Sequence, residues 1–171
     1  MSMPRILVAG IGNIFLGDDA FGVDTVQRLL RRPLPDYVRV VDYGIRGLDL
    51  AYALLDDYDM AILVDAVQRG ESPGTLYVLE PNLSEAADAS QPVLMDAHGM
   101  NPMQVLAMVR AMGGRPRRVL VVGCEPATLG DELEGAMGLS DPVASAVDRA
   151  IGIVESLIAK AAQEREVEVV A

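Results

Sequence analysis

The stretch GIGNIFLGDD, residues 10–19, indicates both the fold of this chain and the place of its binding site. It follows a short apolar run, Ile6–Ala9, and precedes an amphipathic segment, Phe21–Leu30. This order is typical of a buried strand that turns into a helix, and in open α/β sheets ligands bind at such turns. Gly10 and Gly12 allow the backbone to turn tightly. The chain is therefore predicted to be an α/β protein with a site at this turn.

The side chains of the turn favour a cation over the phosphate that helix N-termini usually bind. The dinucleotide fingerprint requires a third glycine where this chain has Phe15. The adjacent carboxylates of Asp18 and Asp19 would repel a pyrophosphate and attract a metal ion. Asp18 alone is more simply explained as a helix cap, and the pattern does not separate its role from that of Asp19. The turn is therefore predicted to recognise a metal.

Composition narrows the classes of partner. The 171 residues suit one domain, and 51% hydrophobic residues without Trp predict an aliphatic core. The net charge of −11 argues against nucleic acid and anionic membranes, and favours a cation or a basic polypeptide. A single cysteine, Cys124, excludes an internal disulfide, and no apolar run approaches the ~20 residues that span a bilayer. We expect a cytoplasmic protein; its oligomeric state is not readable from the sequence, and a monomer is the default expectation.

Alternating apolar and amphipathic segments predict a single α/β domain over residues 1–160. The order of strands and helices indicates a mostly parallel, five-stranded twisted sheet sandwiched between helices. The run 75–79 follows its preceding strand after a short turn, so we expect one antiparallel edge strand there. The charged tail, residues 161–171, is expected to fray. The expected strands are 5–9, 38–41, 60–64, 75–79 and 118–122, and the expected helices are 20–31, 48–55, 102–112 and 142–160.

Three positions form the candidate site: the acid pair Asp18/Asp19 after the first strand, Asp65 at the end of the third, and His98 in a long irregular stretch. If the first and third strands are neighbours, their ends lie about 5 Å apart. Carboxylates together with an imidazole suit zinc, nickel or another divalent metal. Three protein ligands also leave a coordination position open for an external ligand. The coincidence of all three positions at one sheet edge therefore predicts a metal site.

Each of these residues also has a simpler explanation when it is taken alone. Asp65 could accept hydrogen bonds from loop amides, and His98 could be a surface histidine. Asp42 is better explained as a residue that fixes its loop than as a third acid of the site. A nucleophilic pair of Cys124 with His98 is conceivable, but a small buried thiol is the simpler interpretation. A serine nucleophile has little support, because the chain lacks the G-x-S-x-G elbow.

Several motifs of the chain, taken together and in order, resemble the hydrogenase maturation proteases. The first is fairly specific, and the others gain weight from their order and spacing. The similarity spans about Arg5 to Lys160. The motifs are GIGNIFLGDDAFG (10–22), DYGIRG (42–47), ILVDAV (62–67) followed by PGTL (73–76), DAHG (96–99) and VVGCEP (121–126).

The resemblance implies an α/β endopeptidase that removes a C-terminal extension from the large subunit of a nickel–iron hydrogenase once nickel has been inserted. It implies metal-binding and catalytic roles for Asp19, Asp65 and His98, with nickel supplied by the substrate, and either aspartic-type or metal-assisted chemistry. Ile45 stands where this family commonly has Thr, a difference that bears on which large subunit is recognised. The competing hypotheses are a non-enzymatic metal-binding chaperone or assembly module and a nucleotide-binding α/β enzyme.

Overall fold

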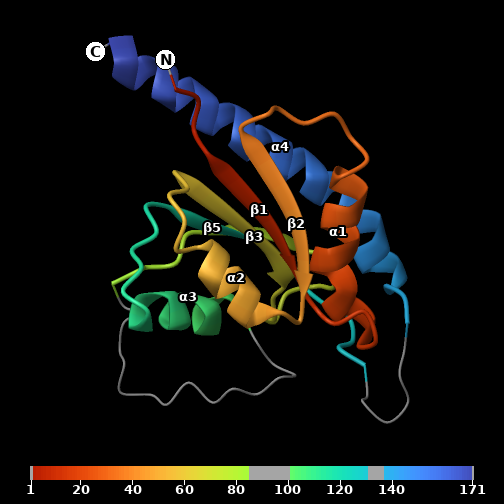
Figure 1. The fold of residues 1–171 in the computed structure, drawn as a ribbon. Coiled ribbons are helices and arrows are strands. Elements are labelled where there is room, and N and C mark those ends of the chain that lie inside the picture. The colour runs from red at the N-terminus through yellow and green to blue at the C-terminus, as the bar shows by residue number, and fades with distance from the viewer. Residues whose placement is uncertain (1, 85–100, 131–136, 171) are drawn as a thin grey trace.

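A computed structural model describes residues 2–84, 101–130 and 137–170 of the chain. Its centre is a five-stranded sheet in the order β2-β1-β3-β5-β4 (Figure 1). Four strands are parallel, and β4 runs antiparallel to β5 at one edge. The predicted α/β class, mixed sheet and antiparallel edge strand are therefore confirmed. The strands are β1 (Ile6–Ile11), β2 (Val38–Gly44), β3 (Met60–Ala66), β4 (Leu76–Leu79) and β5 (Val119–Cys124).

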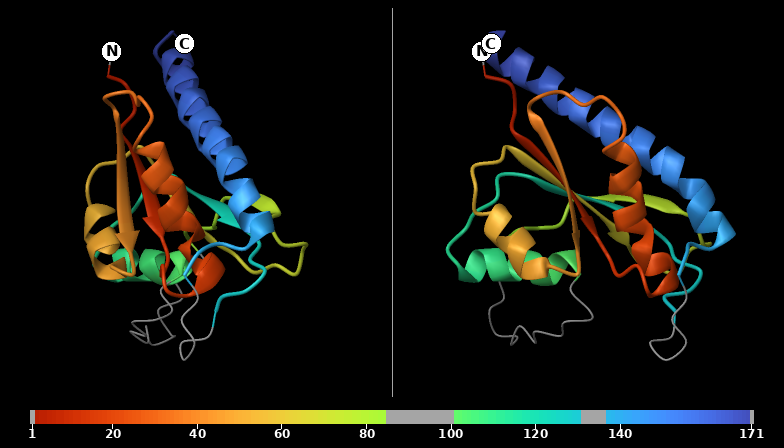
Figure 2. Two further views of the ribbon diagram at one scale, coloured as in Figure 1. Left: turned by 90° about the vertical axis from the view of Figure 1, so that its right-hand side faces the viewer. Right: turned by 45° about the vertical axis from the view of Figure 1, so that its right-hand side comes forward.

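Helices cover both faces of the sheet (Figure 2). On one face α1 (Phe21–Leu29) and α4 (Asp141–Val170) pack on the even-numbered residues of β1 and β3. On the other face α2 (Gly47–Ala53) and α3 (Pro102–Ala111) pack on the odd-numbered residues of the same strands. The three central strands are apolar on both faces because each face lies under helices. Within the described residues, no helix combines the length and apolarity needed to cross a membrane.

The topology places a crevice at the carboxyl ends of β1 and β3. From β1 the chain crosses to β2 on one side, whereas β3 lies on the other side of β1. The connecting helices α1 and α2 lie on opposite faces. In open α/β sheets, ligands bind where the strand order reverses in this way. The segments that follow β1 and end β3 are those that carry the predicted acids.

Most predicted boundaries agree with the structure to within two residues. Helix α3 begins at Pro102, and Asn101 caps it: its side chain accepts from the Gln104 N–H, while the Gln104 side chain accepts from the Asn101 N–H. Strand β3 runs two residues further than predicted. Asp65 therefore lies within the strand, in register with Gly123 of β5.

The C-terminal segment differs from the prediction. Helix α4 does not end near Lys160 but continues to Val170. Its extension is fixed to the domain by two ion pairs, from Arg165 to Asp59 at 2.6 Å and from Glu164 to Arg118 at 3.3 Å. Ala, Gln, Glu and Arg, which make up all of residues 161–166, are also strong helix formers. The sequence suggested fraying because the segment is charged and lies at the C-terminal end.

Candidate active site

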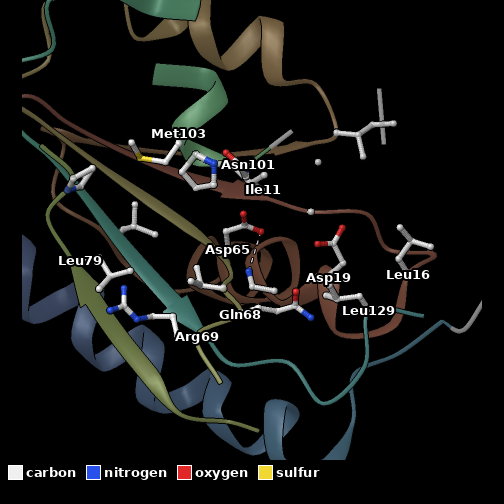
Figure 3. A pocket seen from close by; sticks show the side chains of 18 of the residues that line it. Ile11, Leu16, Asp19, Asp65, Gln68, Arg69, Leu79, Asn101, Met103 and Leu129 are labelled. Atoms are coloured by element: carbon white, nitrogen blue, oxygen red, sulfur yellow. Dashed lines mark hydrogen bonds between the residues drawn. The ribbon is translucent and has the colours of Figure 1, made fainter. Parts of the chain in front are cut away.

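A pocket of about 800 Å³ opens at the carboxyl ends of the strands (Figure 3). Asp19 and Asp65 both line it, from the segment after β1 and from the end of β3. Apolar side chains make up much of the remaining wall. These are Ile11, Leu16, Ile45, Val67, Leu79, Met103, Val121 and Leu129. A largely apolar pocket with a few converging polar groups is the usual form of a binding site.

Asp19 lies in the short 3-10 helix Gly17–Ala20 that precedes α1. Its Oδ2 accepts a hydrogen bond of 2.9 Å from the Asn13 N–H, and its side chain is half-buried. Burial raises the pKa of this carboxyl, and the Asn13 bond only partly opposes the increase. A Cβ at Gly12 would overlap the Asp19 carbonyl oxygen, so only glycine allows this close approach. The turn therefore holds one carboxylate over the end of β1.

Asp65 is more deeply buried, with 5% of its surface exposed. Its Oδ1 accepts one hydrogen bond of 2.8 Å, from the Ala66 N–H. Burial raises its pKa well above the usual value, and the negative charge of Asp19 raises it further. The two carboxylates therefore act on each other, and each is poorly compensated. Strongly raised carboxyl pKa values inside a pocket are typical of functional sites.

Asp18 has a different environment from its neighbour Asp19. It is fully buried and does not line the pocket. Its carboxylate accepts hydrogen bonds from the Ala127 and Thr128 N–H groups at 2.8 and 3.2 Å, and from the Ser140 N–H and hydroxyl at 2.7 and 2.8 Å. Asp18 thus joins three segments of the chain and is not a helix cap. The structure separates the two acids, which the sequence pattern alone did not.

The third predicted position, His98, lies outside the described residues. Within the described part of the chain, no group of three His, Cys, Asp or Glu residues could hold a metal ion. Asp42 does not line the pocket and accepts a hydrogen bond of 3.1 Å from Gln27, which favours its loop-fixing role. Cys124 is fully buried, and burial raises the pKa of its thiol to about 11. It is therefore protonated at neutral pH, as expected of a structural thiol rather than a nucleophile.

The sequence did not single out Arg69 or Glu125, which together shape the wall beside β4. Arg69 lines the pocket. Glu125, only 4% exposed, accepts hydrogen bonds of 2.8 Å from both the Arg69 N–H and the Tyr77 hydroxyl. Glu125 could have been noticed in the sequence, since it is a charged residue directly after the buried run of β5. A buried carboxylate at such a position requires hydrogen-bond partners.

Known proteins share this fold and sequence. The family model for hydrogenase maturation proteases of the HycI type matches residues 23–157. The chain is 36% identical over 160 residues to the hydrogenase expression/formation protein HupM of Azotobacter chroococcum mcd 1, covering 93% of this chain and 74% of that protein. It is 34% identical over 149 residues to the hydrogenase 2 maturation protease of Escherichia coli K12, covering 86% of each.

The solved structures agree. The hydrogenase maturating endopeptidase HybD from Escherichia coli superposes with a TM-score of 0.70 at 33% identity, covering 91% of this chain and 93% of that one. The family model and these relatives show that the chain is a hydrolase of the endopeptidase class. The chain belongs to the hydrogenase maturation protease family. The hypotheses of a non-enzymatic assembly module and of a nucleotide-binding enzyme are not supported.

Proposed function

We propose that this endopeptidase removes the C-terminal extension of a nickel–iron hydrogenase large-subunit precursor after nickel insertion, and that Asp19 and Asp65 contact the nickel carried by the substrate. The observation that carries the proposal is the pair of poorly compensated carboxylates in the large pocket of a chain from this family. His98 stays the predicted third ligand, on the sequence pattern and on the resemblance.

The charge at the site supports a cation as the element recognised. Asp19 and Asp65 repel each other, as the raised pKa of Asp65 reflects. A divalent ion between them would replace that repulsion with attraction and would favour the ionised form of both groups. Carboxylate oxygens combined with an imidazole are an acceptable donor set for nickel. Binding of the nickel-bearing substrate would thus relieve the repulsion between the two carboxylates.

Two catalytic mechanisms fit the proposed cleavage. In the first, the substrate's nickel polarises the scissile carbonyl, and in the second a carboxylate of the pair acts as general base. In both, the oxygen of a water molecule adds to the carbonyl carbon, and the carbon–nitrogen bond then breaks. The proton released by the water passes to the leaving amine, carried in the second case by a carboxylate of the pair. The apolar walls, including Leu16 and Met103, limit competing water.

A processing assay on nickel-loaded precursor tests the proposal. We expect Asp19→Asn and Asp65→Asn to lower kcat/KM by at least ~100-fold, the scale of a lost acid–base group, without loss of folding. His98→Ala is expected to lower kcat/KM by a similar factor. Asp42→Asn is the matched control, since this acid lies outside the pocket. Mass spectrometry of the precursor reports truncation directly; wild-type rates in both Asn variants would reject the site.

Metal binding gives a second readout that is independent of cleavage. Excess Ni²⁺ at 100 times its dissociation constant would stabilise the native state by about 2.7 kcal/mol. For a chain of this size that corresponds to a rise in Tm of about 5–10 °C. We expect the rise in the wild type and in Asp42→Asn, and its loss in Asp19→Asn and Asp65→Asn. An equal rise in all four proteins would show that nickel binds elsewhere.

A further inference from the structure

Arg69 is the only cationic side chain among the described residues that line the pocket. The other charged residues there are Asp19, Asp65 and Glu80. Glu80 has its own partner outside the pocket wall, the Arg118 guanidinium at 3.3 Å. Arg69 makes no ion pair with any residue in the described ranges. Within the described residues, the pocket thus combines a negative end at the carboxylate pair with one cation that makes no ion pair there.

The position of Arg69 is fixed through both its backbone and its side chain. Its N–H donates to Glu125, and the Glu71 N–H donates to the same carboxylate at 2.9 Å. The Arg69 guanidinium lies over the ring of Tyr77, 5.6 Å from the centroid, and the Tyr77 hydroxyl also donates to Glu125. Stacking of this kind orients a guanidinium while its N–H groups keep their capacity to donate. Arg69 is therefore held ready for an acceptor.

Strand register sets the spacing between Asp65 and Tyr77, the residue on which Arg69 stacks. Asp65, Gly123 and Tyr77 occupy one row across β3, β5 and β4, so Asp65 and Tyr77 project from the same face of the sheet. Gly123 leaves this row open: a Cβ there would lie 2.7 Å from Val67 Cγ2. Val67 packs in that space, and the chain continues over β5 to bring Arg69 onto Tyr77. Two strand spacings separate Asp65 from Tyr77, about 10 Å.

We propose that Arg69 binds a carboxylate of the substrate polypeptide about three residues from the scissile bond. This inference rests on the proposed function, which places the scissile bond beside Asp19 and Asp65. An extended chain advances ~3.3 Å per residue, so a span of about 10 Å corresponds to three residues. Figure 3 shows Arg69 on the other side of Asp65 from Asp19, as a peptide lying across the pocket requires. The carboxylate belongs to the C-terminal extension, either on one of its acidic side chains or at its end.

The arrangement would fix the direction in which the peptide binds. Nickel on the substrate meets the acids, and the carboxylate meets the guanidinium, so a reversed peptide would bring like charges together at both ends. Arginine is suited to this task because its planar group donates two parallel hydrogen bonds to a carboxylate. Lysine provides the charge without that geometry. The substitution of Arg69 by Lys should therefore retain only part of the binding.

Steady-state processing of nickel-loaded precursor by Arg69→Gln, Arg69→Lys and Arg69→Glu tests the inference. We expect KM to rise by about 10- to 100-fold in Arg69→Gln, the range for a lost charge-assisted hydrogen bond, with kcat little changed. The KM of Arg69→Lys should lie between those of wild type and Arg69→Gln, and Arg69→Glu should have the highest KM. The matched control is Arg5→Gln, since Arg5 also stacks on a tyrosine, Tyr58 at 5.1 Å, but lies outside the pocket. An unchanged KM in Arg69→Gln overturns the inference.

Substrate variants distinguish the two sources of the carboxylate. In one set each acidic side chain of the extension is replaced by its amide, and in another Gly-Gly is appended to the C-terminus to displace the terminal carboxylate. The variant that raises KM for the wild type, but not for Arg69→Gln, identifies the partner. Additive effects in every combination would overturn the inference.

A binding measurement separates this inference from the proposed function. The probe is a fluorescently labelled peptide with the sequence of the precursor's C-terminal extension, followed by anisotropy with the wild type and Arg69→Gln. Weaker binding by Arg69→Gln supports the carboxylate contact whether or not cleavage occurs, whereas equal binding rejects it. Failure of the wild type to truncate the precursor would instead reject the proposed function.

Discussion

Four buried or half-buried carboxylates lie at the end of β3 or in the segments that follow β1 and β5, and they form two groups with different surroundings. Asp18 and Glu125 form the first pair, and Asp19 and Asp65 form the second. Asp18 accepts four hydrogen bonds, and Glu125 accepts from two backbone N–H groups and a tyrosine hydroxyl. Asp19 and Asp65 each accept a single hydrogen bond from the described residues. Hydrogen-bond donors stabilise the ionised form of the first pair. In the second pair, burial and mutual repulsion disfavour the ionised form.

The comparison shows how the fold separates carboxylates that hold loops from carboxylates that face the pocket. Hydrogen bonds hold the pKa of Glu125 below its usual value even though burial acts in the opposite direction. For Asp65, burial and the charge of Asp19 outweigh the bond from Ala66, and its pKa is raised. Asp18 and Glu125 position the loops around the pocket, and Asp19 and Asp65 face into it. Stability should therefore depend on the first pair and activity on the second.

The largest expected change in stability follows from Asp18→Ala. It would remove a fully buried carboxylate that accepts four hydrogen bonds, and hydrogen bonds to a charged group contribute about 1.5–3 kcal/mol each. We expect unfolding free energy to fall by about 3 kcal/mol or more, and Tm by roughly 6–12 °C. Asp19→Ala is the control, because it removes one hydrogen bond at a half-buried position. Urea denaturation that shows equal losses for both variants would contradict the comparison.

The contrast between Asp18 and Asp19 also shows what the sequence could predict. The turn, its two acids and their place after a strand follow from local patterns of glycine and apolar residues. Which acid faces the pocket depends on donors at residues 127, 128 and 140, more than a hundred positions away along the chain. No local pattern contains that information. The sequence placed an acid pair at the turn beside the pocket but did not distinguish a supporting carboxylate from a pocket carboxylate.

The same limit applies to other parts of the molecule. The antiparallel edge strand was predictable because a short turn forces it, and the start of α3 was predictable from the Asn101–Pro102 pair. The position of Arg69 was not, since it depends on the register of β3, β5 and β4. The length of α4 was missed for a similar reason: Arg165 reaches Asp59, which is distant in sequence.

A smaller loss of stability is expected for Glu125→Gln. The amide keeps an acceptor oxygen of similar reach but loses the charge that attracts three donors. We expect a lower Tm at neutral pH and faster hydrogen exchange at the Arg69 and Glu71 amides, measured by NMR. Because the native pKa of Glu125 is lowered, its contribution is present above the ordinary value of 4.5 and is lost as pH falls through the native pKa. The difference from wild type should therefore shrink in acid.

The smallest expected effect has the opposite sign and comes from Asp65→Asn in the metal-free protein. Its raised pKa means that the native state binds the proton more tightly than the unfolded chain does. Wild-type stability from this group therefore falls as pH rises from the ordinary value of 3.8 through the raised native pKa. Asn is uncharged at every pH and can still accept from the Ala66 N–H. The variant should melt a few degrees above wild type at neutral pH, with the gain disappearing toward pH 4. Calorimetry with EDTA across this range measures it, and a variant less stable than wild type at pH 7 would remove the distinction between supporting and pocket carboxylates.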